Sequence, residues 1–144
     1  MIRNFFLCLL FFSSIPILAQ ESEIQFTIGT FFKAFHQRDS IALKKVCSEY
    51  LVLHFISESE KGNTFTVDHA SNFYKSIASI PLSTKFEEKI LGFKVQIDGS
   101  MAHVWTPYEF YVNDKLSHFG VNSFQLFKEN DVWKVDYNAD TRRK

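Results

Sequence analysis

Hydrophobic residues in the first third of the chain recur at helical spacing. They lie on one face of an amphipathic helix that runs to about Gln37, and they are Ile24, Ile28, Phe31, Phe32 and Phe35. The pair Asp39-Ser40 follows. Because Asp and Ser side chains accept hydrogen bonds from the free N–H groups of a first helical turn, this pair predicts the start of a second, short helix.

A strand and a third helix are expected next. Residues 50–56 form a β-branched and aromatic run of strand length, and residues 57–64 form a polar loop. The third helix is expected to begin near Thr66, with Asp68 in its first turn, and to end at Pro81. Its apolar stripe consists of Val67, Ala70, Phe73, Ile77 and Ile80.

From Thr84 onward the hydrophobic period changes to two, which is typical of half-buried strands. We expect strands at residues 93–97, 100–112, 115–128 and 132–139, and the residue pairs between them tolerate the positive φ of tight hairpin turns. Those pairs are Asp98-Gly99, Asn113-Asp114 and Asn130-Asp131. Helices followed by a long antiparallel meander predict an α+β domain, with the helices on one face of a curved sheet.

Composition indicates one folded domain. The chain has 144 residues, of which 46% are hydrophobic and 17% aromatic, and this excludes an intrinsically disordered protein. Sixteen basic and sixteen acidic side chains give no net charge, and no long run of one sign occurs, so the charge pattern does not indicate a nucleic-acid partner. No repeat or linker interrupts residues 20–144, which we expect to form a single domain.

The first 19 residues resemble a secretory signal peptide. Arg3 provides a positive start, residues 5–12 are apolar, and Ser13, Ser14 and Pro16 break the run before Ala19. This apolar run is shorter than the roughly 20 residues of a membrane span. We expect cleavage after Ala19 and export to the periplasm or the extracellular medium, and an uncleaved anchor is the alternative.

Two further features of the chain favour a protein that is released after cleavage. The basic tail at residues 141–144 has too few charges for stable lipid or nucleic-acid binding and is expected to fray. Once Cys8 is removed, Cys47 has no partner for a disulfide, and its neighbours Leu43 and Val46 favour a small buried hydrophobe over a nucleophile. No clustered metal-ligand spacing occurs, so neither a metal nor a cofactor is expected.

Two ionisable residues of the meander form a candidate acid/base pair. If Asn113-Asp114 is a two-residue turn, Glu109 lies opposite His118 on the neighbouring strand. A carboxylate there would favour the charged imidazole and fix its tautomer, which makes His118 and Glu109 candidate catalytic residues. A ligand contact or a structural hydrogen bond is the alternative. A one-residue slip, or a bulge at Pro107, would move Glu109 to the opposite face.

The same turn geometry predicts a wall of ligand-binding side chains. It places Trp105 opposite Asn122, and the following turn places Phe124 opposite Tyr137. Because side chains alternate along strands, these four would share a face, and rings mixed with an amide suit a semi-polar cavity. His103 is a weaker candidate for this wall, with a position on the strand surface as the alternative.

The first hairpin predicts that the other face is also partly apolar. The Asp98-Gly99 turn places Phe93, Val95 and Ile97 on the same face as Ala102 and Val104. That face points away from Trp105. A sheet with two partly apolar faces suits a cavity on one side and a partner subunit on the other.

Several segments resemble the nuclear transport factor 2-like superfamily. They are the signal peptide, the amphipathic helix, the Gln37-Arg38-Asp39-Ser40 segment that begins the second helix, the third helix, and the closing Val132-Trp133-Lys134-Val135. More narrowly, residues 105–111 and 117–126 resemble the exported bacterial members known as lumazine-binding or SnoaL-like proteins. The resemblance covers nearly all of the mature chain.

This resemblance implies a cone-shaped α+β fold with a cavity between the helices and the sheet, often a homodimer through the sheet. The superfamily contains isomerases, dehydratases, hydrolases and binding modules, so the fold leaves the reaction open. We expect an exported module that binds a small, partly aromatic ligand. The alternatives are an acid/base enzyme of isomerase or dehydratase type in the same cavity, and a dimerisation or interaction domain whose cavity is filled by its own side chains.

Overall fold

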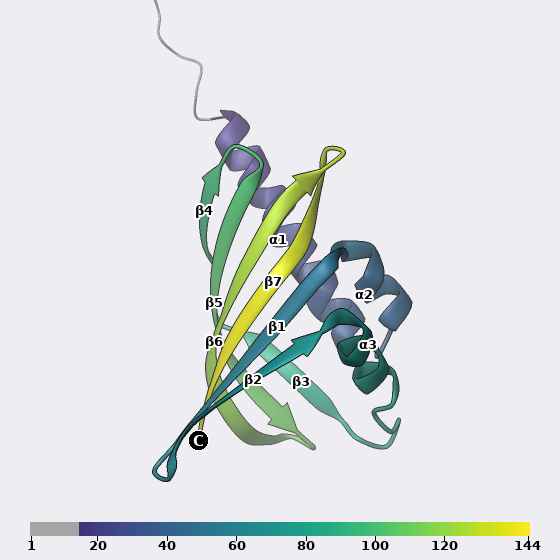
Figure 1. Cartoon of the computed structure of the whole chain (residues 1–144), viewed down its shortest axis with the longest axis vertical. Coiled ribbons are helices and arrows are strands. Elements are labelled where there is room, and N and C mark those ends of the chain that lie inside the picture. The colour runs from purple at the N-terminus through teal and green to yellow at the C-terminus, as the bar shows by residue number, and fades with distance from the viewer. Residues whose placement is uncertain (1–14) are drawn as a thin grey trace, which may run out of the picture.

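The computed structural model describes residues 15–144, where three helices lie on one face of a curved seven-stranded sheet (Figure 1). The helices are α1 (Ile15–His36), α2 (Ser40–Val46) and α3 (Ala70–Ala78). The strands are β1 (Cys47–Ser59), β2 (Gly62–His69), β3 (Phe86–Ile90), β4 (Lys94–Asp98), β5 (Met101–Val112), β6 (Lys115–Glu129) and β7 (Val132–Arg143). The predicted α+β class is confirmed.

The predicted leader is not tested by this structure. Residues 1–14 lie outside the described residues, and the expected cleavage site after Ala19 falls within α1. Among the helices that the structure describes, none is long and apolar enough to cross a membrane.

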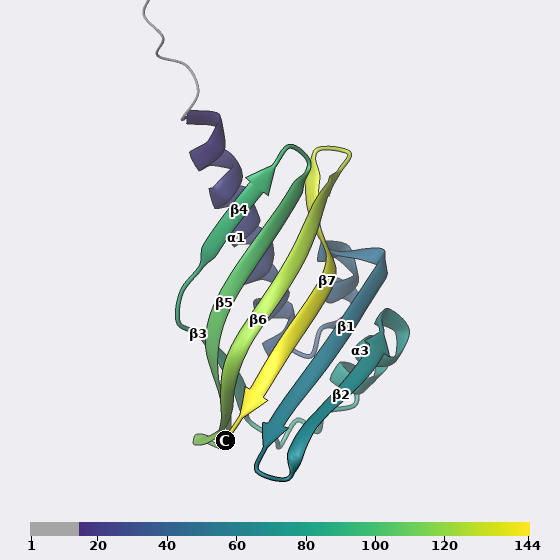
Figure 2. The same cartoon turned by 60° about the vertical axis from the view of Figure 1, so that its left-hand side comes forward.

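The strands follow the order β2-β1-β7-β6-β5-β3, and β4 pairs with β5 beyond the end of β3. Neighbouring strands are antiparallel except β1 and β7, which are parallel. Figure 2 shows the sheet in front with the helices behind it. We call the helix-covered side the inner face and the opposite side the outer face.

The two Asn-Asp pairs form the turns that the sequence predicts. Asn113 and Asp114 have φ values of 49° and 63°, and Asn130 and Asp131 have 48° and 63°. Two consecutive positive φ angles match the right-handed twist of the flanking strands, as in a type I′ hairpin. In the β4–β5 hairpin the central residues are Gly99 and Ser100, one position later than predicted.

Strand β2 replaces the polar loop and the first turn of the predicted third helix. Residues 64–67 are β-branched or aromatic, which favours a strand, and Thr66 pairs with Phe55 of β1. Val67 is exposed on the outer face and is not part of a helical stripe. Helix α3 therefore begins at Ala70, and it buries Phe73, Tyr74 and Ile77.

The core lies between α1 and the inner face of the sheet. The predicted apolar stripe of α1 is buried, and the rings of Phe31 and Phe32 contact Phe124 of β6 edge-on, with centroids 5.6 and 5.8 Å apart. Asp39 caps α2 by accepting hydrogen bonds from two backbone N–H groups. Cys47 is buried, and burial raises the pKa of its thiol to about 12, as expected for an inert core residue.

Candidate functional site

A cavity of about 320 Å³ lies between α1, α3 and the inner face of the sheet. Six phenylalanines line it, and we call this set its aromatic side: Phe31, Phe32, Phe35, Phe55, Phe73 and Phe110. Six polar or charged residues also line it, and we call this set its polar side: Glu88, His118, Asn122, Asn138, Asp140 and Arg142. On the sheet the two sets adjoin, since Phe110 pairs with His118 and Phe55 pairs with Asp140. The volume falls at the lower end of the usual range for small-molecule sites, about 300–1,000 Å³.

A bulge at Asp136 determines which residues of β7 face this cavity. Leu126 pairs with Val135, as predicted, but Gln125 pairs with Tyr137, so Asp136 is an extra residue in β7. An extra residue reverses the alternation of side chains beyond it. Every second residue from position 138 to 142 therefore faces the cavity.

The same bulge makes the predicted pair of Phe124 and Tyr137 wrong. Phe124 lies opposite Asn138, is buried on the inner face and packs against α1. Tyr137 lies on the outer face, where its hydroxyl hydrogen-bonds His54 Nδ1 at 2.7 Å. Tyr137 cannot contact a ligand in the cavity from that side.

A second bulge, at Ser117, separates the predicted acid/base pair. Phe110 pairs with His118, whereas Tyr111 pairs with Leu116, so Ser117 is the extra residue. His118 lines the cavity, but Glu109 is on the outer face, where its carboxylate accepts a hydrogen bond from the Tyr111 hydroxyl at 2.8 Å. The predicted facing of Glu109 and His118 is wrong, because the bulge lies beside the turn and changes the register for the rest of the hairpin.

The same shift moves two predicted ligand-binding residues to the outer face. Trp105 pairs with Ser123 and is 42% exposed, and His103 Nε2 hydrogen-bonds the Ser123 hydroxyl at 3.0 Å. Asn122 pairs with Thr106 and lines the cavity, as predicted. The expected shared face of Val95, Ile97, Ala102 and Val104 is confirmed, and it is the helix-covered inner face. Phe93 was expected on it as well, but it precedes β4 and is 37% exposed.

A hydrogen-bonded chain of three residues crosses the polar side of the cavity. Asn122 Nδ2 donates to Glu88 Oε1 at 2.6 Å, and Asn138 Nδ2 donates to Asn122 Oδ1 at 3.1 Å. Within residues 15–144, no group donates to Glu88 Oε2, and the buried Asn138 Oδ1 accepts no hydrogen bond. This polar side therefore keeps unused hydrogen-bonding capacity.

The carboxyl group of Glu88 has a strongly raised pKa. Burial raises the pKa of its carboxyl to about 7, and the nearby Asp140 carboxylate adds to the rise. The hydrogen bond from Asn122 and the charge of Arg142 act in the opposite direction but are weaker. Glu88 therefore exchanges a proton near neutral pH.

Asp140 and Arg142 form an ion pair within β7. Arg142 donates from Nε to Asp140 Oδ1 at 3.1 Å and from Nη2 to Oδ2 at 2.8 Å. Burial raises the pKa of Asp140, while the hydrogen bonds from Arg142 act to lower it. The expected frayed tail is wrong in this respect, since β7 continues to Arg143 and Arg142 is part of the cavity wall.

His118 is held between aromatic rings at the same end of the cavity. Its ring stacks on Phe110 with centroids 4.8 Å apart, and Tyr108 meets it edge-on at 5.9 Å. Burial lowers the pKa of His118, and the positive charges of Arg142 and Lys144 lower it further. The imidazole is therefore neutral at pH 7, whereas the predicted carboxylate neighbour would have favoured its charged form.

Sequence analysis missed Glu88, Asn138 and Arg142. In hindsight, the alternation of β3 places Glu88 on the same face as Phe86 and Ile90, and this was the available signal for a buried carboxyl. For Asn138 and Arg142 the signal was hidden, because their orientation depends on the bulge. In residues 15–144, no group of three or more His, Cys, Asp or Glu side chains is arranged to hold a metal ion.

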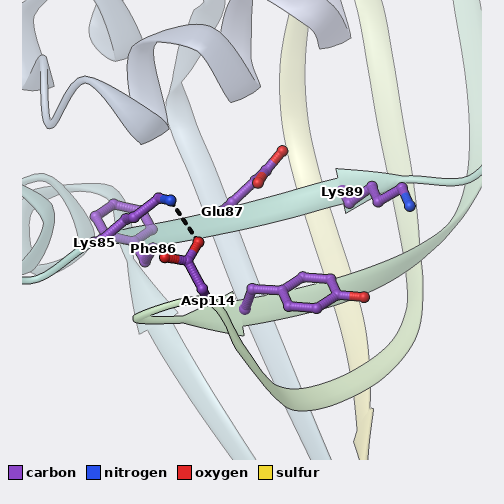
Figure 3. Close-up of a pocket in the computed structure, with 6 residues that line it drawn as sticks. Lys85, Phe86, Glu87, Lys89 and Asp114 are labelled. Carbon is purple, nitrogen blue, oxygen red and sulfur yellow. Dashed lines mark hydrogen bonds and ion pairs between the residues drawn. The ribbon is translucent and has the colours of Figure 1, made fainter.

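Another hollow, at the β3 edge and the β5–β6 turn, has a different character (Figure 3). Lys85 and Asp114 form an ion pair at its rim, and the charged side chains of Glu87 and Lys89 are also exposed. Water screens exposed charges of this kind, so their interactions, with each other or with a ligand, are weak. We therefore place the candidate site in the inner cavity.

Comparison with known proteins identifies the fold. No family model and no curated protein matches the chain. A protein from Novosphingobium aromaticivorans, described as NTF2-like with a cystatin-like fold, superposes with a TM-score of 0.70 at 11% identity, covering 89% of this chain and 84% of its own. The chain has the nuclear transport factor 2-like (NTF2-like) fold.

Two further solved structures superpose on the chain. A Streptomyces avermitilis protein of the NTF2-like family, described as a candidate dehydratase, has a TM-score of 0.69 at 13% identity, covering 89% of this chain and 99% of its own. A Novosphingobium aromaticivorans protein is described as a candidate aromatic ring hydroxylase. It has a TM-score of 0.66 at 18% identity, covering 88% of this chain and 91% of its own. These likenesses support the NTF2-like prediction and do not reach the lumazine-binding branch.

Proposed function

We propose that this NTF2-like domain binds a small, partly aromatic molecule in the cavity between its helices and its sheet. The observation that carries the proposal is the open volume of about 320 Å³, lined both by phenylalanine rings and by polar groups, of which the buried Asn138 Oδ1 has no hydrogen-bond partner. Binding sites for small molecules combine mostly apolar walls with a few convergent polar groups. A domain that filled its cavity with its own side chains would not retain this volume.

Fluorescence of N-phenyl-1-naphthylamine, a neutral aromatic probe, tests the proposal. Ser76 of α3 is exposed and lines the cavity, so Ser76→Trp places a large ring in the opening without burying a polar group. We expect the wild type to bind the probe and Ser76→Trp to bind it at least tenfold more weakly. Ser71→Trp is the matched control, since Ser71 is exposed on the same helix and does not line the cavity. Equal binding by both variants would contradict the proposal.

An acid/base enzyme is the second candidate, and one observation favours it. A carboxyl group with a pKa near 7, enclosed in a cavity, suits proton transfer at neutral pH, and Glu88 has this property. In such an enzyme Glu88 would exchange the proton with substrate, and Glu109 would take no part, since it is on the outer face. Loss of turnover in Glu88→Gln with retained probe binding would distinguish an enzyme from a binding module.

Export is part of the proposal and has its own test. The argument rests on the positive start, apolar run and small residue at the end of residues 1–19. We expect the protein isolated from its source to begin at Gln20. Protein sequencing from the N-terminus would show this, and a chain that begins at Met1 would contradict cleavage.

A further inference from the structure

We propose that the ligand of this cavity is a cation, an aryl-alkyl ammonium whose charged nitrogen binds the free carboxyl oxygen of Glu88 while its ring packs against the phenylalanines. This inference rests on the proposed function and names the ligand class of the same site. It is argued from the charges around the cavity, the surroundings of Glu88 and the aromatic side.

The cavity has more carboxyl groups than cations. Asp68, Glu88 and Asp140 line it, and Arg142 is the one lysine or arginine among its described lining residues. Both oxygens of Asp140 accept hydrogen bonds from Arg142, so this pair neutralises itself. Glu88 and Asp68 have no ion-pair partner within residues 15–144.

Glu88 is partly buried, and one of its carboxyl oxygens has no donor among the described residues. Asn122 donates to Oε1, and no described group donates to Oε2. A buried carboxylate is stable only when it is paired, and otherwise it takes up a proton, as the raised pKa of Glu88 shows. A ligand ammonium would provide the missing positive charge and up to three N–H donors.

The other groups near Glu88 do not replace that cation. Asp140 is negative and opposes ionisation of Glu88, whereas Arg142 favours it but is bound to Asp140. His36 of α1 accepts a hydrogen bond from the Glu88 backbone N–H through Nε2, so its imidazole is uncharged, and burial lowers its pKa. Tyr108 donates its hydroxyl hydrogen to the Thr141 carbonyl.

The aromatic side of the cavity also favours a cation. The faces of phenylalanine rings attract positive charge, and desolvation strengthens this attraction. The guanidinium of Arg142 already lies over the Phe55 ring, 4.5 Å from its centroid. A ligand with a short alkyl chain between ring and nitrogen could pack its ring among the phenylalanines and direct its ammonium to Glu88.

Three probes of similar size and different charge test the proposal, measured by calorimetry at pH 8 with the wild type and Glu88→Gln. They are 2-phenylethylamine (cation), 2-phenylethanol (neutral) and 3-phenylpropionate (anion). We expect the cation to bind about tenfold more tightly than the alcohol, since hydrogen bonds between charged groups exceed neutral ones by about 1.4 kcal/mol, and the anion to bind most weakly. Glu88→Gln should remove the advantage of the cation, and Glu109→Gln on the outer face should retain it.

The pH dependence in the wild type provides a test that needs no variant. As the pH falls below about 7, Glu88 is protonated and the affinity for 2-phenylethylamine should fall by about tenfold in total, with no such fall for 2-phenylethanol. Equal or tighter binding of the alcohol or the anion at pH 8 overturns the cation proposal. If none of the three binds but N-phenyl-1-naphthylamine does, the cation proposal fails alone. If no probe binds, the proposed function fails as well.

Discussion

Asn122 donates a side-chain N–H to Glu88 Oε1 at 2.6 Å, which joins the middle of β6 to the edge strand β3. Asn122 in turn accepts a hydrogen bond from Asn138 of β7. Three strands thus contribute to one polar network, and its only group that titrates near neutral pH is the Glu88 carboxyl. The protonation of Glu88 therefore links the stability of the fold to the chemistry of the cavity.

Replacing Glu88 with glutamine should change how stability depends on pH. The folded-state pKa of Glu88 is raised from an ordinary 4.5 to about 7, so the folded protein binds this proton more tightly than the unfolded chain does. The resulting stabilisation is complete below about pH 4.5 and is lost as the pH rises through 7. Glu88→Gln is neutral at every pH, so its stability should exceed that of the wild type by about 1 kcal/mol or less at pH 5 and by about 3 kcal/mol at most at pH 8.

Urea unfolding of both proteins at pH 5, 6, 7 and 8 would measure this difference. Comparing the two proteins at each pH cancels the contributions of the other titrating groups, provided these do not interact with Glu88. Glu60→Gln, in the exposed β1–β2 turn, is the matched control. A difference between Glu88→Gln and the wild type that stays constant from pH 5 to pH 8 would contradict the assignment of a raised pKa to Glu88.

Gly120 should tolerate no side chain. A Cβ atom at this position would lie 1.7 Å from the backbone oxygen of Thr141 on the neighbouring strand, far inside van der Waals contact. Because β6 and β7 are joined by ladder hydrogen bonds on either side, they cannot separate there without disrupting the sheet between His118 and Asn122. We expect Gly120→Ala to lower the free energy of unfolding by roughly 2–4 kcal/mol.

Thermal unfolding of Gly120→Ala and Gly29→Ala checks this prediction. Gly29 is exposed in the middle of α1, and a Cβ there has no atom within 4 Å. Since alanine favours a helix interior over glycine by about 1 kcal/mol, Gly29→Ala should be as stable as the wild type or more stable. Equal stability of the two variants would show that β7 moves away from Gly120 without cost.

The two Asn-Asp turns of the sheet could be predicted from the sequence, but the pairing beyond them could not. Asn113-Asp114 and Asn130-Asp131 adopt positive φ because their local chemistry favours it, and local chemistry is what a sequence records. The bulge at Asp136 depends on a distant contact, since Asp136 Oδ1 accepts a hydrogen bond from Ser48, 88 positions earlier in the chain. No pattern near Asp136 indicates it, and a single extra residue reverses every side chain beyond it.

Four of the seven residues predicted for the site lie on the outer face, and three lie on the inner face. The inner face of the meander does line a cavity, and Asn122, Phe124 and His118 lie on that face. Glu109 and Trp105 are on the outer face because the bulge at Ser117 shifts the register by one. The catalytic role of His118 and the ligand contact of Asn122 remain predictions, since both residues line the cavity.

The outer face should form the homodimer that the family resemblance implies. Several large hydrophobic side chains are exposed on it, and such clusters on a sheet face are typical of protein–protein contacts; they are Tyr50, Phe65, Met101, Trp105 and Phe119. We expect sedimentation velocity to show a dimer for the wild type at micromolar concentration. Trp105→Glu should raise the dimer dissociation constant at least about thirtyfold, because a buried tryptophan at the centre of an interface is worth about 2 kcal/mol or more.

Phe26→Glu is the control, since Phe26 is 76% exposed on α1, on the opposite side of the sheet. A wild type that stays monomeric at every concentration, or a dimer that Phe26→Glu weakens and Trp105→Glu does not, would contradict an interface on the outer face.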